Sequence, residues 1–130
     1  MRVLLDTCAL IWFLRGDPEL SERAASLIED PDTDVFVSVV SIWEIAIKAS
    51  LGKLKAPIGL QDSLEDELID AGFHILPVAY KHAAAVYSLP SVHSDPFDRL
   101  LICQCQAEKL AAITNDPHWK DHRYEIPVVW

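Results

Sequence analysis

The chain has 130 residues, of which 51% are hydrophobic and 24% charged, and its formal net charge is −9. This length fits one domain over residues 1–130, since domains commonly have roughly 100–150 residues, and the composition argues against disorder. The negative net charge argues against a nucleic-acid-binding protein, since such proteins are usually basic. The exception would be a protein in which some of the acids bind cations and the cations contact the phosphates.

Nothing in the sequence predicts a membrane or secreted protein. No apolar run approaches the ~18 residues that a membrane helix needs. Asp6 interrupts the apolar N-terminus, and no small-residue cleavage site follows it. The three cysteines lack the spacing of a disulfide framework, so we expect a reducing, cytoplasmic location. Cys103 and Cys105 are expected to be core residues.

Strands and helices are predicted to alternate along the chain. Apolar and β-branched runs predict strands at 2–6, 34–38, 73–78, 110–114 and 125–130. Pro127 indicates that the last strand is an edge strand. Apolar residues at helical spacing predict helices over 7–14, 20–29, 41–51, 60–71, 79–89 and 96–109. This alternation predicts an α/β fold with a mainly parallel sheet and helices on both faces.

Two of the predicted helices begin with acidic residues. Asp95 precedes Pro96 as a favoured N-cap, and Asp98 follows in the first turn. Ser41 and Glu44 form the pattern S-x-x-E, which predicts a capping box at the front of its helix. A purely structural role would also explain each of these acids, because an acid at the start of a helix caps it or complements its dipole.

Four acids could nevertheless meet at one edge of the sheet. Asp6 ends the first strand, Glu44 begins the helix after the second, and Asp116 follows the fourth. The C-terminal ends of parallel strands share one edge, where ligands bind. Asp98 joins this group only if the start of its helix returns to that edge. Carboxylates in close proximity need protons or cations, and hard divalent ions prefer oxygen ligands. A set without histidine or cysteine suits Mg²⁺ or Mn²⁺ rather than zinc.

Four motifs, taken together and in order, resemble those of PIN-domain ribonucleases, specifically the VapC-type toxins of toxin–antitoxin pairs. The motifs are LLDT at 4–7, SIWEIAIK at 41–48, HSDPFDRLLI at 93–102 and TND at 114–116. The resemblance implies a three-layer α/β/α fold with strand order 3-2-1-4-5. It implies a homodimer and a neutralising antitoxin partner whose tail occupies the active-site groove. It also implies a metal site made by Asp6, Glu44, Asp98 and Asp116.

We therefore hypothesise a Mg²⁺- or Mn²⁺-dependent endoribonuclease that acts as a toxin and cuts RNA with a metal-activated water. Asp6 and Asp98 would be the central ligands, and Glu44 and Asp116 would complete the site or hold a second ion. Five further residues are candidates for a supporting role, in which they would hydrogen-bond a metal ligand or contact phosphate. Asp95 could instead cap its helix, and Arg99 could instead pair with a neighbouring acid. These candidates are Thr7, Asp95, Arg99, Asn115 and Lys48.

Several other interpretations stay open or are disfavoured. A PIN-fold module that binds RNA or a partner without cutting would share the fold but has no need of the four acids. A phosphatase of the haloacid dehalogenase type needs a second Asp two residues after the first, where this chain has Cys8. The five histidines lack zinc-hydrolase spacing. Trp12 and Trp43 are expected to be core residues.

Overall fold

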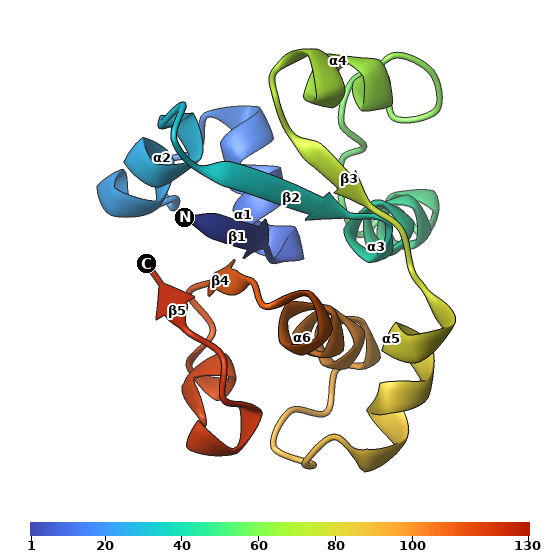
Figure 1. Ribbon diagram of the computed structural model, residues 1–130. Helices are drawn as coiled ribbons and strands as arrows, with labels where there is room; N and C mark the ends of the chain where they lie inside the picture. Colours follow the sequence, from blue (N-terminus) through green and yellow to red (C-terminus); the bar gives the residue numbers. More distant parts are fainter.

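The computed structural model describes residues 1–130 and contains one sheet of five parallel strands (Figure 1). The order β3-β2-β1-β4-β5 confirms the predicted strand order 3-2-1-4-5. The strands are β1 (Arg2–Leu5), β2 (Asp34–Ser38), β3 (His74–Leu76), β4 (Ala111–Ile113) and β5 (Val128–Val129). The helices are α1 (Thr7–Arg15), α2 (Glu22–Glu29), α3 (Val39–Ser50), α4 (Leu64–Asp70), α5 (Tyr80–Ala85) and α6 (Pro96–Glu108).

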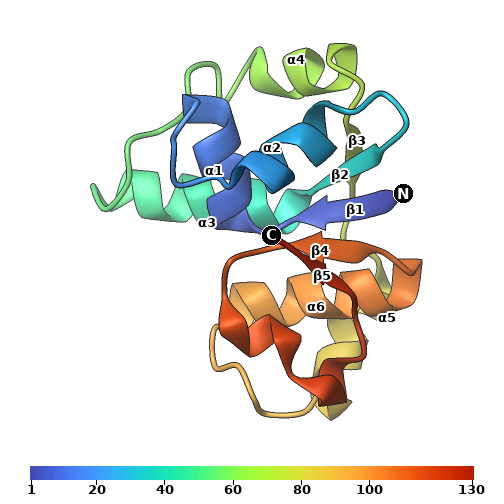
Figure 2. The same cartoon turned by 90° about the vertical axis from the view of Figure 1, so that its left-hand side faces the viewer.

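The two faces of the sheet are covered by different helices. Figure 2 shows α1, α2 and α4 on one side and α5 and α6 on the other. Successive strand residues point to opposite faces, so in β1 Val3 and Leu5 join one buried cluster while Leu4 joins the other. Helix α3 contacts both α1 and α6 and so links the two helical layers. This arrangement confirms the expected α/β/α layering.

The second half of the chain has shorter elements than the sequence predicts. Helix α4 begins at Leu64 rather than at 60, and the helix predicted over 79–89 is α5 followed by the 3-10 helix η1 (Val86–Ser88). The strand predicted from 125 is only β5, at the sheet edge. Two 3-10 helices, η2 (Pro117–Lys120) and η3 (His122–Tyr124), fill the stretch before it, with Asp side chains capping both.

The capping box predicted at Ser41 and Glu44 is wrong, because α3 begins three residues earlier. β2 passes directly into α3, and the side chain of Ser38 caps the helix by accepting a hydrogen bond from Val40 N at 3.0 Å. Ser41 is instead fully buried inside the first turn, where its Oγ accepts a hydrogen bond from Thr7 Oγ1 at 3.0 Å. This bond ties the start of α1 to α3.

The sequence left the position of α6 open, and the structure resolves it. Because β4 is parallel to β1 and follows α6 directly, the helix runs back across the sheet and begins near the C-terminal ends of the strands. Asp95 caps it through hydrogen bonds from Phe97 N and Asp98 N at 2.8 and 3.1 Å. Cys103 and Cys105 are buried in the same helix, as predicted. No helix in the chain is both long and apolar enough to cross a membrane.

A matched pair of isoleucine substitutions tests the packing of the central sheet. Ile113 in β4 is fully buried, whereas Ile58 is 93% exposed. We expect Ile113→Ala to lower the free energy of unfolding by about 2–5 kcal/mol through lost burial and a residual cavity. Ile58→Ala should change it by less than about 0.5 kcal/mol. Urea denaturation of both variants measures the difference, and equal losses would contradict the assigned core.

Candidate active site

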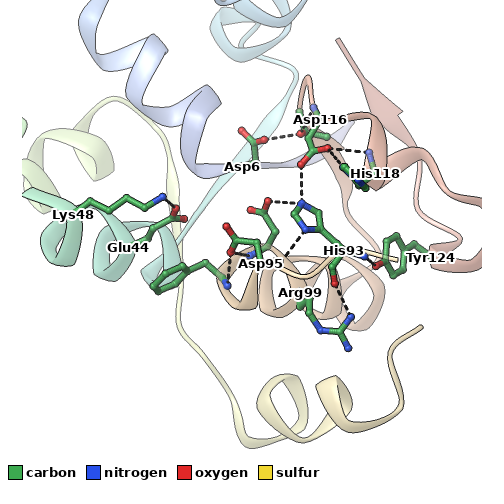
Figure 3. Close-up of polar contacts among 12 residues, drawn as sticks. Asp6, Glu44, Lys48, His93, Asp95, Arg99, Asp116, His118 and Tyr124 are labelled. Atoms are coloured by element: carbon green, nitrogen blue, oxygen red, sulfur yellow. Dashed lines mark hydrogen bonds and ion pairs between the residues drawn. The ribbon is translucent and has the colours of Figure 1, made fainter. Parts of the chain in front are cut away.

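The four acids expected at the sheet edge line one hollow of about 300 Å³. Asp6 follows β1, Glu44 lies in α3, Asp98 lies in the first turn of α6, and Asp116 lies just beyond β4. Figure 3 shows the polar contacts around them. The complete lining consists of Asp6, Thr7, Cys8, Trp12, Glu44, Lys48, Asp95, Asp98, Asn115 and Asp116.

Asp6 is deeply buried, with 6% of its surface exposed. Its Oδ1 accepts a hydrogen bond from Ala9 N at 2.7 Å, which caps α1, and its Oδ2 accepts one from Thr114 Oγ1 at 2.6 Å. Burial raises the pKa of Asp6 to about 6, with smaller contributions from the negative charges of Asp116 and Glu44, and the two hydrogen bonds oppose this increase. The site therefore holds its first acid at a free-energy cost.

Glu44 is 5% exposed and leaves part of its carboxylate without a partner. Its Oε2 pairs with the ammonium group of Lys48 one turn further along α3. Its Oε1 is buried and accepts no hydrogen bond from the protein. A buried carboxylate oxygen without a donor is costly, so this atom is suited to a bound cation.

Asp98 shares the start of α6 with the capping residue Asp95. The pKa of Asp98 is raised to about 7, chiefly by burial and then by the nearby Asp95 carboxylate, while His93 opposes the increase. The two acids have different surroundings: Asp95 accepts backbone N–H groups at the helix start, whereas Asp98 Oδ2 lies 2.9 Å from His93 Nε2.

Asp116 contacts two histidines. Its Oδ2 lies 2.7 Å from His93 Nε2, and its Oδ1 lies 2.8 Å from His118 Nδ1 and accepts a bond from His118 N at 2.9 Å. Burial alone would raise the pKa of Asp116, but the hydrogen bonds from His118 and His93 outweigh it and lower that pKa. Asp116 is thus the carboxylate that ionises most easily among Asp6, Asp98 and Asp116.

These properties fit a hard divalent cation. Four carboxylates supply only oxygen ligands, which Mg²⁺ and Mn²⁺ prefer. The unpartnered Oε1 of Glu44 and the raised pKa values of Asp6 and Asp98 both indicate negative charge that the protein itself does not fully compensate. A cation bound between these carboxylates would compensate it.

The remaining candidates have varied surroundings. Thr7 bonds to Ser41, Lys48 pairs with Glu44, and Asn115 lines the hollow. Arg99 forms no ion pair with an acid in the structure, and its guanidinium is held by the protein itself. Its guanidinium donates instead to carbonyl oxygens of the preceding segment at 3.0–3.5 Å, those of Val86, Leu89, Pro90 and His93.

One expectation about a side chain near this site is wrong. Trp43 is 57% exposed rather than a core residue, because the side of α3 that faces the core carries Ile42 and Ile45. Its ring packs edge to face with Phe97. His93 is part of the site, because its Nε2 contacts both Asp98 and Asp116, and no role was predicted for it from the sequence. Its place two residues before the capping Asp95 was the available signal.

Comparison with known proteins gives a family match that covers nearly the whole chain. A family model described as the PIN domain matches residues 3–123. No curated protein matches the chain in sequence.

Several solved structures have the same fold at low sequence identity. VapBC2 from Rickettsia felis, solved with a DNA fragment from its promoter, is 15% identical, with a TM-score of 0.69 and coverage of 99% of this chain and 98% of that chain. A toxin–antitoxin complex from Klebsiella pneumoniae is 18% identical, with a TM-score of 0.63 and coverage of 98% and 96%. The PIN domain endonuclease Utp24 is 20% identical, with a TM-score of 0.56 and coverage of 98% and 82%.

The raised pKa values predict how stability depends on pH without metal. Because the folded protein keeps protons on Asp6 and Asp98 that the unfolded chain releases, these groups make stability fall as pH rises from about 4 to about 7. In EDTA, Asp98→Asn should reduce this fall by at least about 1 kcal/mol. The exposed control Asp70→Asn should leave it unchanged. Urea denaturation between about pH 5 and pH 8 measures the effect, and equal slopes would contradict the assigned environment of Asp98.

Proposed function

Because the chain belongs to the PIN-domain family, we propose that it is a Mg²⁺- or Mn²⁺-dependent endoribonuclease that acts as the toxin of a toxin–antitoxin pair. The observation that carries this proposal is the gathering of Asp6, Glu44, Asp98 and Asp116 in one hollow. The fold shared with a toxin–antitoxin complex and with a PIN domain endonuclease supports it.

In this proposal the four carboxylates hold the cation, with Asp6 and Asp98 at the centre. When bound, a divalent ion neutralises phosphate charge and lowers the pKa of a water molecule. The side chains orient the site: Thr114 fixes one oxygen of Asp6, and Lys48 fixes one oxygen of Glu44. Attack by water on phosphorus, in line with the leaving 3′ oxygen, gives a 5′-phosphate and a 3′-hydroxyl. This outcome needs no nucleophilic side chain.

The net charge of −9 is compatible with an RNA substrate. Much of the acidity lies away from the site, on the exposed face of α4 that carries Glu65, Asp66 and Glu67. Lys53 and Lys55 are exposed in the segment after α3 and would attract phosphates. Because only a few basic side chains are available to contact phosphates, we expect weak binding to bulk RNA, and higher salt should weaken it further.

A PIN-fold module without activity is the alternative that the experiment below must separate. It would bind RNA or a partner and would have no use for the cation. The partly uncompensated carboxylates favour the nuclease, since such groups reduce stability and a passive module gains nothing from them. Membership of the PIN family argues against the haloacid dehalogenase-type phosphatase.

An antitoxin is the protein partner that this function requires. The chain offers an apolar groove of about 440 Å³ between α1 and the segment that leads to α4. Ile11, Leu14, Pro57 and Leu64 line it, together with the exposed Ile58. Arg15, Lys55 and the acidic Glu67 also line the groove. The two basic side chains outnumber the single acid and would pair with acidic groups of a bound segment. We propose that part of the antitoxin covers this groove, and the cytoplasm is where we expect the complex.

Cleavage of RNA by purified protein tests the proposed activity. Incubation of total tRNA with the protein and Mg²⁺ or Mn²⁺ should give discrete fragments with 5′-phosphates, and EDTA should abolish them. Asp98→Asn should lower the cleavage rate by a factor of about 100 or more, because the site loses a charged ligand. The exposed Asp70→Asn receives the same chemical change and should cleave as the wild type does.

Other outcomes identify which part of the proposal fails. Equal cleavage by wild type and Asp98→Asn would show that this site is not responsible. No cleavage combined with calorimetric binding of Mn²⁺ would indicate a narrower RNA target than tRNA. No cleavage and no Mn²⁺ binding would leave the module without activity as the better description.

The proposed homodimer has a separate test. Tyr80 and Tyr87, on α5 and η1, are 90% and 98% exposed, which is unusual for aromatic side chains. Light scattering should give twice the mass of the chain, and the double substitution Tyr80→Ser and Tyr87→Ser should shift the protein toward monomer. A monomer mass for the wild type at high concentration would contradict the dimer.

A further inference from the structure

Every polar atom of His93 has a partner within the protein. Its backbone N donates to Tyr124 Oη at 2.7 Å, and its carbonyl oxygen accepts from Arg99 Nη1 at 3.0 Å. On the ring, Nδ1 accepts a hydrogen bond from Asp95 N at 3.1 Å. The side chain is only 11% exposed. Both the backbone and the ring of His93 are therefore held in one orientation, as Figure 3 shows.

The contact at Nδ1 determines which ring nitrogen carries the proton. A backbone N–H can only donate, so Nδ1 of His93 must offer its lone pair to Asp95 N. In a neutral imidazole the proton then lies on Nε2. That Nε2–H points at Asp98 Oδ2, 2.9 Å away, and at Asp116 Oδ2, 2.7 Å away.

We propose that His93 is a positioning residue of the metal centre, whose Nε2–H holds the carboxylates of Asp98 and Asp116 together. This inference rests on the proposed function of the same site. Asp98 comes from the start of α6 and Asp116 from the segment after β4, so no shared element fixes their separation. A single donor between them sets where one oxygen of each lies and leaves Asp98 Oδ1 for a cation, whereas Asp116 Oδ1 is already contacted by His118 N and Nδ1. Hydrogen bonds to ligating carboxylates commonly tune metal sites in this way.

A direct metal-ligand role for His93 fits the structure less well. Ligand atoms of His93, Asp116 and His118 do lie within 4.8 Å of one another. Coordination through Nε2 would, however, require the proton to move to Nδ1, where it would face the N–H of Asp95 at 3.1 Å. Two donors would then oppose each other in a partly buried place, which is unfavourable. The ring is therefore built to donate.

The ring nitrogens can be examined without any metal. Long-range ¹⁵N–¹H correlation spectra of the metal-free protein distinguish a protonated Nε2 from a protonated Nδ1. The proposal expects the Nε2–H form for His93. The opposite form would overturn the proposal, whatever the protein does with cations.

A second experiment compares two substitutes of nearly equal length. His93→Gln retains an N–H donor near the place of Nε2, whereas His93→Met fills the same space without one. Calorimetric Mn²⁺ binding should weaken by about 10–100-fold in His93→Met, the usual effect of losing such a supporting contact. It should weaken much less in His93→Gln. His122→Met, at a histidine side chain that is 91% exposed and outside the site, is the control and should bind as the wild type does.

The outcomes separate this inference from the proposed function. Thermal unfolding of all variants identifies general damage: equal losses of stability in Gln and Met with unchanged Mn²⁺ affinity would overturn the positioning role. Equal losses of Mn²⁺ affinity in Gln and Met would also overturn it, because the donor would not be what matters. If Asp98→Asn binds Mn²⁺ as well as the wild type does, the proposed metal centre fails and this inference fails with it.

Discussion

The structure places several carboxylates inside one small hollow, and this crowding of like charge is the constraint on which the rest of the site depends. Water cannot solvate these groups fully, and each disfavours the ionisation of its neighbours. The protein answers with single donors placed on particular oxygens: Ala9 N and Thr114 Oγ1 for Asp6, and the ammonium group of Lys48 for Glu44. The compensation is incomplete, and the uncompensated negative charge makes the hollow suited to a cation.

Crowding of this kind lowers stability, so the scaffold must supply it elsewhere. The sheet does this by burying apolar side chains on both of its faces, in clusters of 14 and 12 residues. Its short central strands β1 and β4 are buried almost throughout. The site lies where these strands end, and its backbone is an extension of the best-packed part of the molecule. Asp6 N even continues the sheet by donating to Ile113 O at 3.1 Å.

Much of this arrangement could be predicted from sequence, for reasons that differ between residues. Asp6 and Asp116 follow buried strands, and parallel topology alone brings strand ends to one edge. Asp98 could not be placed in this way, because the return of α6 to that edge depends on the path of the chain between β3 and α6. The start of α3 was misjudged because Ser38 and Ser41 are both acceptable caps, and only packing against Thr7 distinguishes them. His93 was given no role from sequence because its partners come together only in the fold. Arg99 was a candidate, but its backbone carbonyl partners could not be predicted for the same reason.

Arg99 stabilises the segment before α6 through carbonyl oxygens alone. Every residue has the same backbone carbonyl, so the contacts of Arg99 fix the conformation of this loop whatever side chains the loop carries. The exposed Ser91 can therefore vary during evolution without disturbing the residues that the loop presents. Arg99 itself has no such freedom, since lysine lacks the planar fork that reaches several acceptors at once. Side chains on this rim of the site can thus change while one partly buried guanidinium preserves its geometry.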